Sequence, residues 1–216
     1  MGYKLLLIIV TIVFAATLPV PDQYEKGSSV SLSVLSQEQA EQLFTEFKEH
    51  SEIPFDYPVD GCFARATAMS KVAEQSKIQM GKVWVEGTLR VTPKSKSLPN
   101  IEWGYHVATT LYVKGVTGEP ELKVFDPSMF DKPVSLEEWT GAMQVDGKPK
   151  PNIKRIYFGE RFQMWPEGKA KERKKNNWVK EDLKNTEQYL NYYTARQNEL
   201  KAFTKKYPGK VLKAVY

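Results

Sequence analysis

The chain of 216 residues contains a single cysteine, Cys62. It follows Asp60-Gly61 at the predicted start of a helix, where free backbone N–H groups and the helix dipole stabilise a thiolate. The same N–H groups can receive an oxyanion, and Gly61 lets a substrate approach the backbone. Cys62 is therefore a candidate nucleophile, with an inert buried cysteine or an intermolecular disulfide as the alternatives.

A thiol nucleophile needs a base, and the base needs a group that orients it. Of the two histidines, His50 lies near the predicted end of a helix, beside charged residues, and is interpreted as a surface residue. His106 lies in an apolar strand and needs a polar partner. Asp126 ends the neighbouring strand, directly before a proline, and could orient His106 across the hairpin. The pattern suggests a Cys-His-Asp triad, although a turn-forming Asp-Pro and a hydrogen-bonded core histidine are the structural alternatives.

One cysteine and two histidines form no zinc-ligand pattern, so we expect no metal and no other cofactor. The net charge of +5 is unevenly distributed: residues 168–216 hold 13 Lys or Arg against 5 Asp or Glu, and the remainder is slightly acidic. The basic character therefore belongs to the C-terminal tail.

The candidate residues lie in an α+β pattern in which helices precede antiparallel strands. Ser36 and Gln39 form a predicted capping box for a helix that ends near His50. The other predicted elements are a helix over 61–76, strands over 82–89, 103–113 and 121–125, a short helix over 135–143 and a strand over 153–158. Apolar residues at helical spacing predict an amphipathic helix from about 169 to 206.

The first 16 residues resemble a secretory signal peptide, with Lys4 followed by an apolar run and then small residues. An uncleaved anchor is the alternative. Four regions are predicted: a signal peptide at 1–16, a linker or short pro-segment at 17–35, a catalytic domain at 36–165 and a basic helical tail at 166–216. Both readings of the leader predict export, so the expected location is secreted or periplasmic.

Three segments resemble the bacterial protein-glutaminases in the family's order: IPFDYPVDGCFARATAM at 53–69, WGYHVATTLYV at 103–113, and VFDPSMF at 124–130 with Trp139 shortly after. The resemblance spans about residues 50–145. It implies a papain- and transglutaminase-like fold, with the cysteine helix packed on an antiparallel sheet. The short N-terminal region, the single cysteine and the basic tail depart from the family's pattern.

The resemblance also implies an activity, hydrolysis of glutamine side-chain amides in proteins or peptides to glutamate and ammonia. Cys62 would form a thioester, His106 would transfer protons and Asp126 would orient His106. Trp103 and Tyr105 would line the glutamine slot or belong to the core.

The expected partners are protein or peptide substrates that bear glutamine. A transglutaminase or cysteine peptidase with the same triad is an alternative, as is a non-enzymatic exported module that binds through its basic tail. The tail contains no nucleic-acid motif, so no nucleic acid is expected, and no membrane association after signal cleavage. A protein partner for the tail helix stays open.

Overall fold

The structure is a computed structural model that describes residues 17–20, 25–26, 30–94, 98, 100–143, 152–166, 177–208 and 210–213. The predicted signal peptide, residues 1–16, and the basic run 169–175 lie outside the described residues. Within the described part, no helix is long and apolar enough to cross a membrane.

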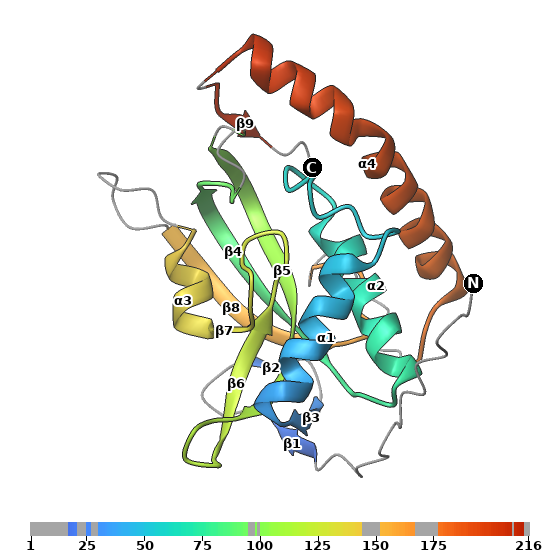
Figure 1. Cartoon of the computed structure of the whole chain (residues 1–216), viewed down its shortest axis with the longest axis vertical. Coiled ribbons are helices and arrows are strands. Elements are labelled where there is room, and N and C mark those ends of the chain that lie inside the picture. Colours follow the sequence, from blue (N-terminus) through green and yellow to red (C-terminus); the bar gives the residue numbers. More distant parts are fainter. Residues whose placement is uncertain are drawn as a thin grey trace, which may run out of the picture.

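In the described residues, nine strands form one mixed sheet, and four helices pack against it (Figure 1). The elements in chain order are β1 (Thr17–Pro19), β2 (Glu25–Lys26), β3 (Ser31–Leu35), α1 (Gln37–Glu49), α2 (Cys62–Gln75), β4 (Gly81–Val91), β5 (Ile101–Lys114), β6 (Pro120–Phe125), β7 (Val134–Ser135), α3 (Leu136–Gly141), β8 (Asn152–Glu160), α4 (Lys180–Lys206) and β9 (Leu212–Lys213).

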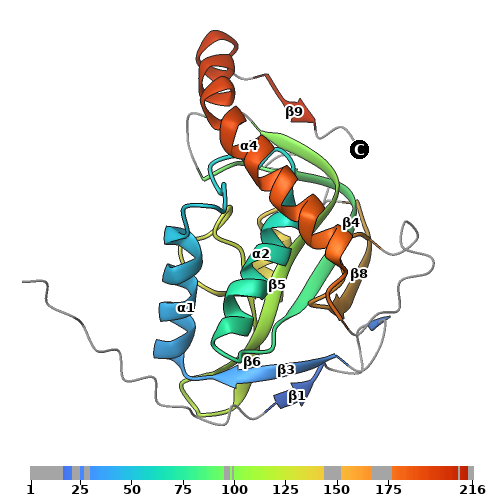
Figure 2. The same cartoon turned by 90° about the vertical axis from the view of Figure 1, so that its right-hand side faces the viewer.

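The centre of the sheet is antiparallel, because β5 pairs antiparallel with β4 and β6, and β4 pairs antiparallel with β8. The predicted α+β arrangement is confirmed, including the helix near the C-terminus. Figures 1 and 2 show α1, α2 and α4 on one side of the sheet and α3 on the other. The cysteine helix therefore packs on an antiparallel sheet, as the sequence predicted.

Two clusters of buried residues form the core, one on each side of β5. Tyr105, Val107 and Leu111 face the cluster that contains α1 and α2. Ala108 and Tyr112 face the other cluster, which includes Trp139 of α3. This alternation follows from the two-residue period of a strand, and it buries both faces of β5.

Helix α1 begins with the predicted capping box. The Gln39 N–H donates to Ser36 Oγ at 3.2 Å, and the Ser36 N–H donates to Gln39 Oε1 at 2.9 Å. Helix α2 begins differently, because its N-cap is Gly61, at φ 81° in the left-handed region, and it makes no side-chain capping bond. A β-carbon is strained in this conformation, which gives Gly61 a structural reason to be glycine.

One edge of β5 lacks a strand partner over residues 103–108 in the described structure. The edge opposite β4 pairs with β6 from Thr109 to Lys114 and with β9 at Ile101 and Glu102. Between these two pairings the loop before α2 approaches the edge, since the indole N–H of Trp103 donates to the Val59 carbonyl at 3.0 Å. The gap in the sheet thus brings the start of α2 beside the middle of β5.

Two predicted segments differ from the structure. The region 17–35, predicted as a linker or short pro-segment, contains β3, which joins the main sheet beside β5 and buries Leu32 and Leu35. Strand β3 lies between β1 and β5, and its apolar residues Leu32, Val34 and Leu35 supply the side chains that pack on the core. The tail helix ends near Lys206 as predicted, whereas its described part begins at Lys180.

Candidate active site

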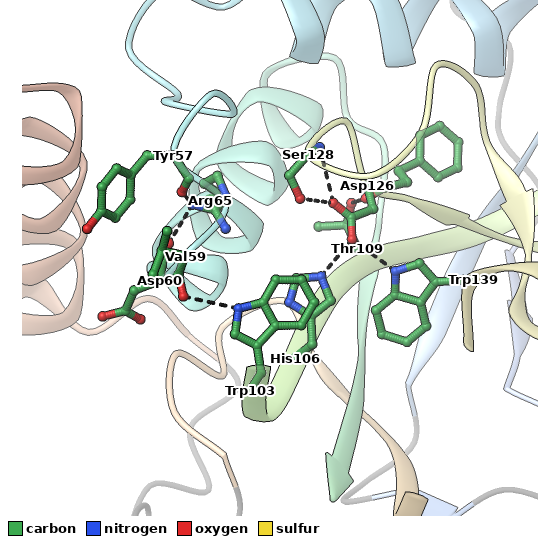
Figure 3. Close-up of polar contacts among 11 residues, drawn as sticks. Tyr57, Val59, Asp60, Arg65, Trp103, His106, Thr109, Asp126, Ser128 and Trp139 are labelled. Carbon is green, nitrogen blue, oxygen red and sulfur yellow. Dashed lines mark hydrogen bonds and ion pairs between the residues drawn. The ribbon is translucent and has the colours of Figure 1, made fainter. Parts of the chain in front are cut away.

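His106 and Asp126 form a buried pair between β5 and the end of β6. His106 Nε2 lies 2.7 Å from Asp126 Oδ2, and the two residues are 1% and 4% exposed (Figure 3). The contact exists because β6 pairs antiparallel with β5 and carries Asp126 back toward His106. The structure therefore brings these two predicted residues together.

Asp126 accepts three further hydrogen bonds. The indole N–H of Trp139 donates to Oδ2 at 2.9 Å, while the backbone N–H and the hydroxyl of Ser128 donate to Oδ1 at 3.2 and 2.5 Å. Burial alone would raise the pKa of Asp126, but the charge and hydrogen bond of His106, with the bonds from Ser128 and Trp139, bring it down to about 2. Asp126 is thus a carboxylate at neutral pH.

Aromatic rings fix the His106 imidazole on both sides. Trp103 stacks on it with ring centroids 4.3 Å apart and planes 8° apart, and Trp139 lies at 5.6 Å with an interplanar angle of 30°. The two indoles also make the bonds to Val59 and Asp126, so each ring is itself held in place. The imidazole has little freedom to rotate away from Asp126.

Cys62 is the first residue of α2 and is 4% exposed. Burial is the main influence on its thiol and raises the pKa to about 12. The positive charge of Arg65 and a backbone hydrogen bond with Val107 act in the opposite direction. Because Val107 follows His106 on β5, this backbone contact places the sulfur next to the histidine strand. At neutral pH the resting thiol keeps its proton.

The structure does not join Cys62 and His106 by a hydrogen bond. His106 Nδ1 is buried and has no partner among the described residues. With Nε2 occupied by Asp126, Nδ1 is the ring nitrogen left to exchange a proton with another group. A buried imidazole nitrogen without a partner is costly, which is typical of a functional group.

The predicted substrate-binding residues occupy different environments. Trp103 covers the His106 ring, and Gly61 forms the turn before Cys62. Tyr105 points into the core beside Trp84, at a centroid distance of 5.9 Å. The role of these three residues in binding glutamine stays a prediction.

Sequence reasoning missed several residues around this site. Ser128 and Trp139 lie within or just after the motif quoted for Asp126, so their spacing to the acid was a visible signal. Arg65 and Tyr193 contact the turn before Cys62. Tyr193 is 133 residues from its partner Asp60, and no local pattern could have linked them.

No group of three or more His, Cys, Asp or Glu side chains in the described part of the chain could hold a metal ion. The candidate site contains a buried thiol, an imidazole and a carboxylate. These groups can carry out nucleophilic attack and proton transfer at a carbonyl.

Comparison with known proteins defines the class first. Residues 40–143, which contain Cys62, His106, Asp126 and Trp139, match the family described as glutaminase. The chain is accordingly a hydrolase that acts on amide C–N bonds. The match to the glutaminase family covers this region, which contains all three candidate residues.

Solved structures show the same fold. A crystal structure of protein-glutaminase has a TM-score of 0.62 and 24% identity, over 75% of this chain and 89% of that one. The NMR structure of protein-glutaminase from Chryseobacterium proteolyticum has a TM-score of 0.62 and 23% identity, over the same shares. A crystal structure of pro-protein-glutaminase has a TM-score of 0.63 and 24% identity, over 82% of this chain and 62% of that one. No curated protein matches the sequence.

Proposed function

We propose that the protein is an exported protein-glutaminase, which hydrolyses the side-chain amide of glutamine residues in proteins or peptides. The observation that carries this proposal is the buried His106–Asp126 pair at 2.7 Å, which leaves the second imidazole nitrogen unpartnered, together with the backbone contact between Cys62 and Val107, the neighbour of His106 on β5. The glutaminase family match and the protein-glutaminase fold support the choice of amide and of substrate.

The first half of the reaction forms a thioester. His106 Nδ1 takes the proton of the Cys62 thiol, which is required because the thiol pKa of about 12 leaves little thiolate at neutral pH. The sulfur attacks the side-chain carbonyl carbon of glutamine, and the oxygen becomes an oxyanion near the first N–H groups of α2. His106 then gives its proton to the amide nitrogen, the C–N bond breaks and ammonia leaves.

The second half returns the enzyme to its starting state. His106 removes a proton from water, whose oxygen attacks the thioester carbon. The C–S bond breaks, glutamate is released, and Cys62 regains a proton from His106. Asp126 accepts the Nε2–H bond throughout, so it favours the imidazolium and keeps Nδ1 directed at the reacting groups.

The test is ammonia release from casein by purified mature protein, with Cys62→Ala as the matched control. We expect release by the wild type and none by the variant, with each deamidated glutamine heavier by about 1 Da in mass spectra. Crosslinked products would instead indicate a transglutaminase, and shortened products a peptidase. Equal ammonia from both proteins would exclude the proposal.

Export is tested separately. The proposed location, secreted or periplasmic, rests on the apolar run after Lys4. We expect the full chain, expressed in a bacterial host, to be recovered outside the cytoplasm and shortened near residue 16. A product that keeps its first 16 residues and stays in the cytoplasm would contradict this location.

A further inference from the structure

Asp60, two residues before Cys62, is held through both its side chain and its backbone. Its carboxylate accepts the Gly61 N–H at 2.6 Å and the Tyr193 hydroxyl at 2.6 Å. Its backbone carbonyl accepts Arg65 Nη1 at 2.7 Å (Figure 3). We call Asp60, Arg65 and Tyr193 the Asp60 clamp. These contacts come from α2, α4 and the turn itself.

Arg65 is a buried cation with an unusual set of partners. It is 2% exposed, and Nη1 donates to the backbone carbonyls of Tyr57 and Asp60. Nη2 has no partner, and no ion pair to Arg65 occurs among the described residues. Burying a guanidinium without a carboxylate contact costs free energy, so we expect the charge of Arg65 to have a functional role. Burial dominates the pKa of Cys62, and the charge of Arg65 is the largest influence that lowers it.

Tyr193 lies on α4 and packs against the turn at Asp60 and Gly61. Its ring stacks on Tyr57, with centroids 5.1 Å apart and planes 17° apart. A β-carbon on Gly61 would come within 2.4 Å of the Tyr193 ring, so the ring and the turn are in direct contact. Burial, followed by the bond to Asp60, raises the pKa of Tyr193, so its hydroxyl remains a donor across the working pH range.

We propose that Arg65 and Tyr193 are positioning residues for Cys62, so that α4 completes the active site through the Asp60 clamp. This inference rests on the proposed role of Cys62 as nucleophile. Tyr193 holds the Asp60 carboxylate, and with it the Gly61 N–H and the direction in which the chain enters α2. Arg65 holds the same turn through two carbonyls and places its charge where a thiolate or an oxyanion develops.

The first test compares Tyr193→Phe with Tyr192→Phe. Each change removes one hydroxyl, but Tyr193 is 3% exposed and touches the clamp, whereas Tyr192 is 51% exposed. For Tyr193→Phe we expect kcat for ammonia release to fall about tenfold, with KM changed less than about twofold, because the nucleophile is misplaced after substrate binds. We expect Tyr192→Phe to behave as the wild type.

A second readout needs no substrate. Because Cys62 is the only cysteine, alkylation by iodoacetamide, followed by intact mass against pH, reports this thiol alone. For Tyr193→Phe the profile should shift to higher pH, since the charge of Asp60 raises the pKa of Cys62 and has lost the Tyr193 bond.

Substitutions of Arg65 separate geometry from charge. Arg65→Lys keeps the charge but lacks the planar fork that spans two carbonyls, so kcat should fall while the alkylation profile stays close to the wild type. Arg65→Met removes both, and we expect its profile to move to higher pH by about one unit.

The clamp is overturned if Tyr193→Phe retains the kcat and the alkylation profile of the wild type. It is also overturned if Tyr193→Phe and Arg65→Met lower thermal stability but change neither kcat nor the alkylation profile, because a purely structural contact would give that result. The wild type could release no ammonia while the alkylation profiles of Tyr193→Phe and Arg65→Met shift to higher pH as expected. In that case the proposed function fails and the Asp60 clamp around Cys62 stands.

Discussion

The two halves of the candidate site are built in different ways. His106 and Asp126 lie 20 residues apart on adjoining strands, and their supports, Ser128 and Trp139, follow within 13 residues of Asp126. The turn before Cys62 depends instead on Tyr193, 133 residues away. The His106–Asp126 side is therefore built from one hairpin and the residues just after it, whereas the Cys62 side also includes a contact from α4.

The same contrast appears in the charges. On the hairpin side, every polar atom of the Asp126 carboxylate is matched by donors, and its pKa is low. On the helix side, Arg65 is a buried cation, and the buried amine of Lys82 on β4 donates to Thr67 of α2. Neither makes a carboxylate hydrogen bond among the described contacts. The helix side thus carries a buried guanidinium charge that no described carboxylate hydrogen bond offsets, whereas the Asp126 charge on the hairpin side is matched by donors.

Asp126→Asn should break the hairpin side most severely. The amide keeps the size of the acid but cannot stabilise an imidazolium, and it brings its own N–H toward donors from His106 and Trp139. We expect kcat for ammonia release to fall by about 10³ to 10⁴. Steady-state ammonia assays measure the loss, and circular dichroism checks that the fold remains. If kcat falls by less than about tenfold, Asp126 does not orient the base.

Gly61→Ala should break the helix side. The new β-carbon would lie 2.4 Å from the Tyr193 ring, in a backbone conformation with φ 81°. We expect a loss of about 1–3 kcal/mol in the free energy of unfolding, with a fall in kcat of about 10². Urea unfolding and ammonia release measure the two effects. Gly141→Ala is the matched control, because a β-carbon there meets nothing within 4 Å. Equal stability of the two variants would contradict the close packing of α4 on the turn.

Lys82→Met tests the buried amine on the helix side, and it should affect catalysis less than either of the two substitutions above. Lys82 is fully buried and donates to Thr67 Oγ1 at 2.7 Å and to the Gln163 carbonyl at 2.6 Å. Burial lowers its pKa to about 7, while the charges of Asp182 and Cys62 act in the opposite direction. Between pH 7 and the ordinary lysine pKa of 10.5, the folded state therefore binds fewer protons than the unfolded state.

Because of Lys82, the free energy of unfolding of the wild type should rise with pH in this window, by up to about 1.4 kcal/mol per pH unit. Below pH 7 the folded protein carries the full cost of a charged buried amine. Urea unfolding at several pH values should show this slope in the wild type relative to Lys82→Met. Parallel slopes in the two proteins would mean that Lys82 stays charged in the folded state throughout this window, and would contradict the lowered pKa.

The sequence predicted those parts of the molecule that short-range patterns determine. The Ser36–Gln39 box, the cysteine helix and the strand around His106 follow from capping residues and from the spacing of apolar and β-branched residues. Asp126 was located because its strand is the hairpin partner of the His106 strand, so one loop length fixes their proximity. Whether Cys62, His106 and Asp126 act as a triad stays a prediction that the proposed experiments test.

Other features depend on tertiary contacts that no local pattern encodes. Strand β3 forms because β5 offers it an edge, not because 31–35 is strongly strand-forming. Tyr193 becomes a functional candidate only because α4 meets the turn before Cys62, whereas Arg65 bonds that turn locally from α2. Trp103 and His106 stack although they are three residues apart, which simple alternation along a strand would place on opposite faces. The register shift in β4 between Glu86 and Leu89 lies opposite this stretch and increases the local twist.

Burial of the single thiol has a consequence for the lifetime of the enzyme in oxidising surroundings. The thiolate is the form that attacks peroxides and disulfides, and a thiol with a pKa of about 12 offers almost none of it at neutral pH. With one cysteine in the chain, no intramolecular disulfide can form. Burial of the thiol therefore favours slow sulfenic acid formation in the resting protein, and its reactivity rises when a neighbouring base removes the proton.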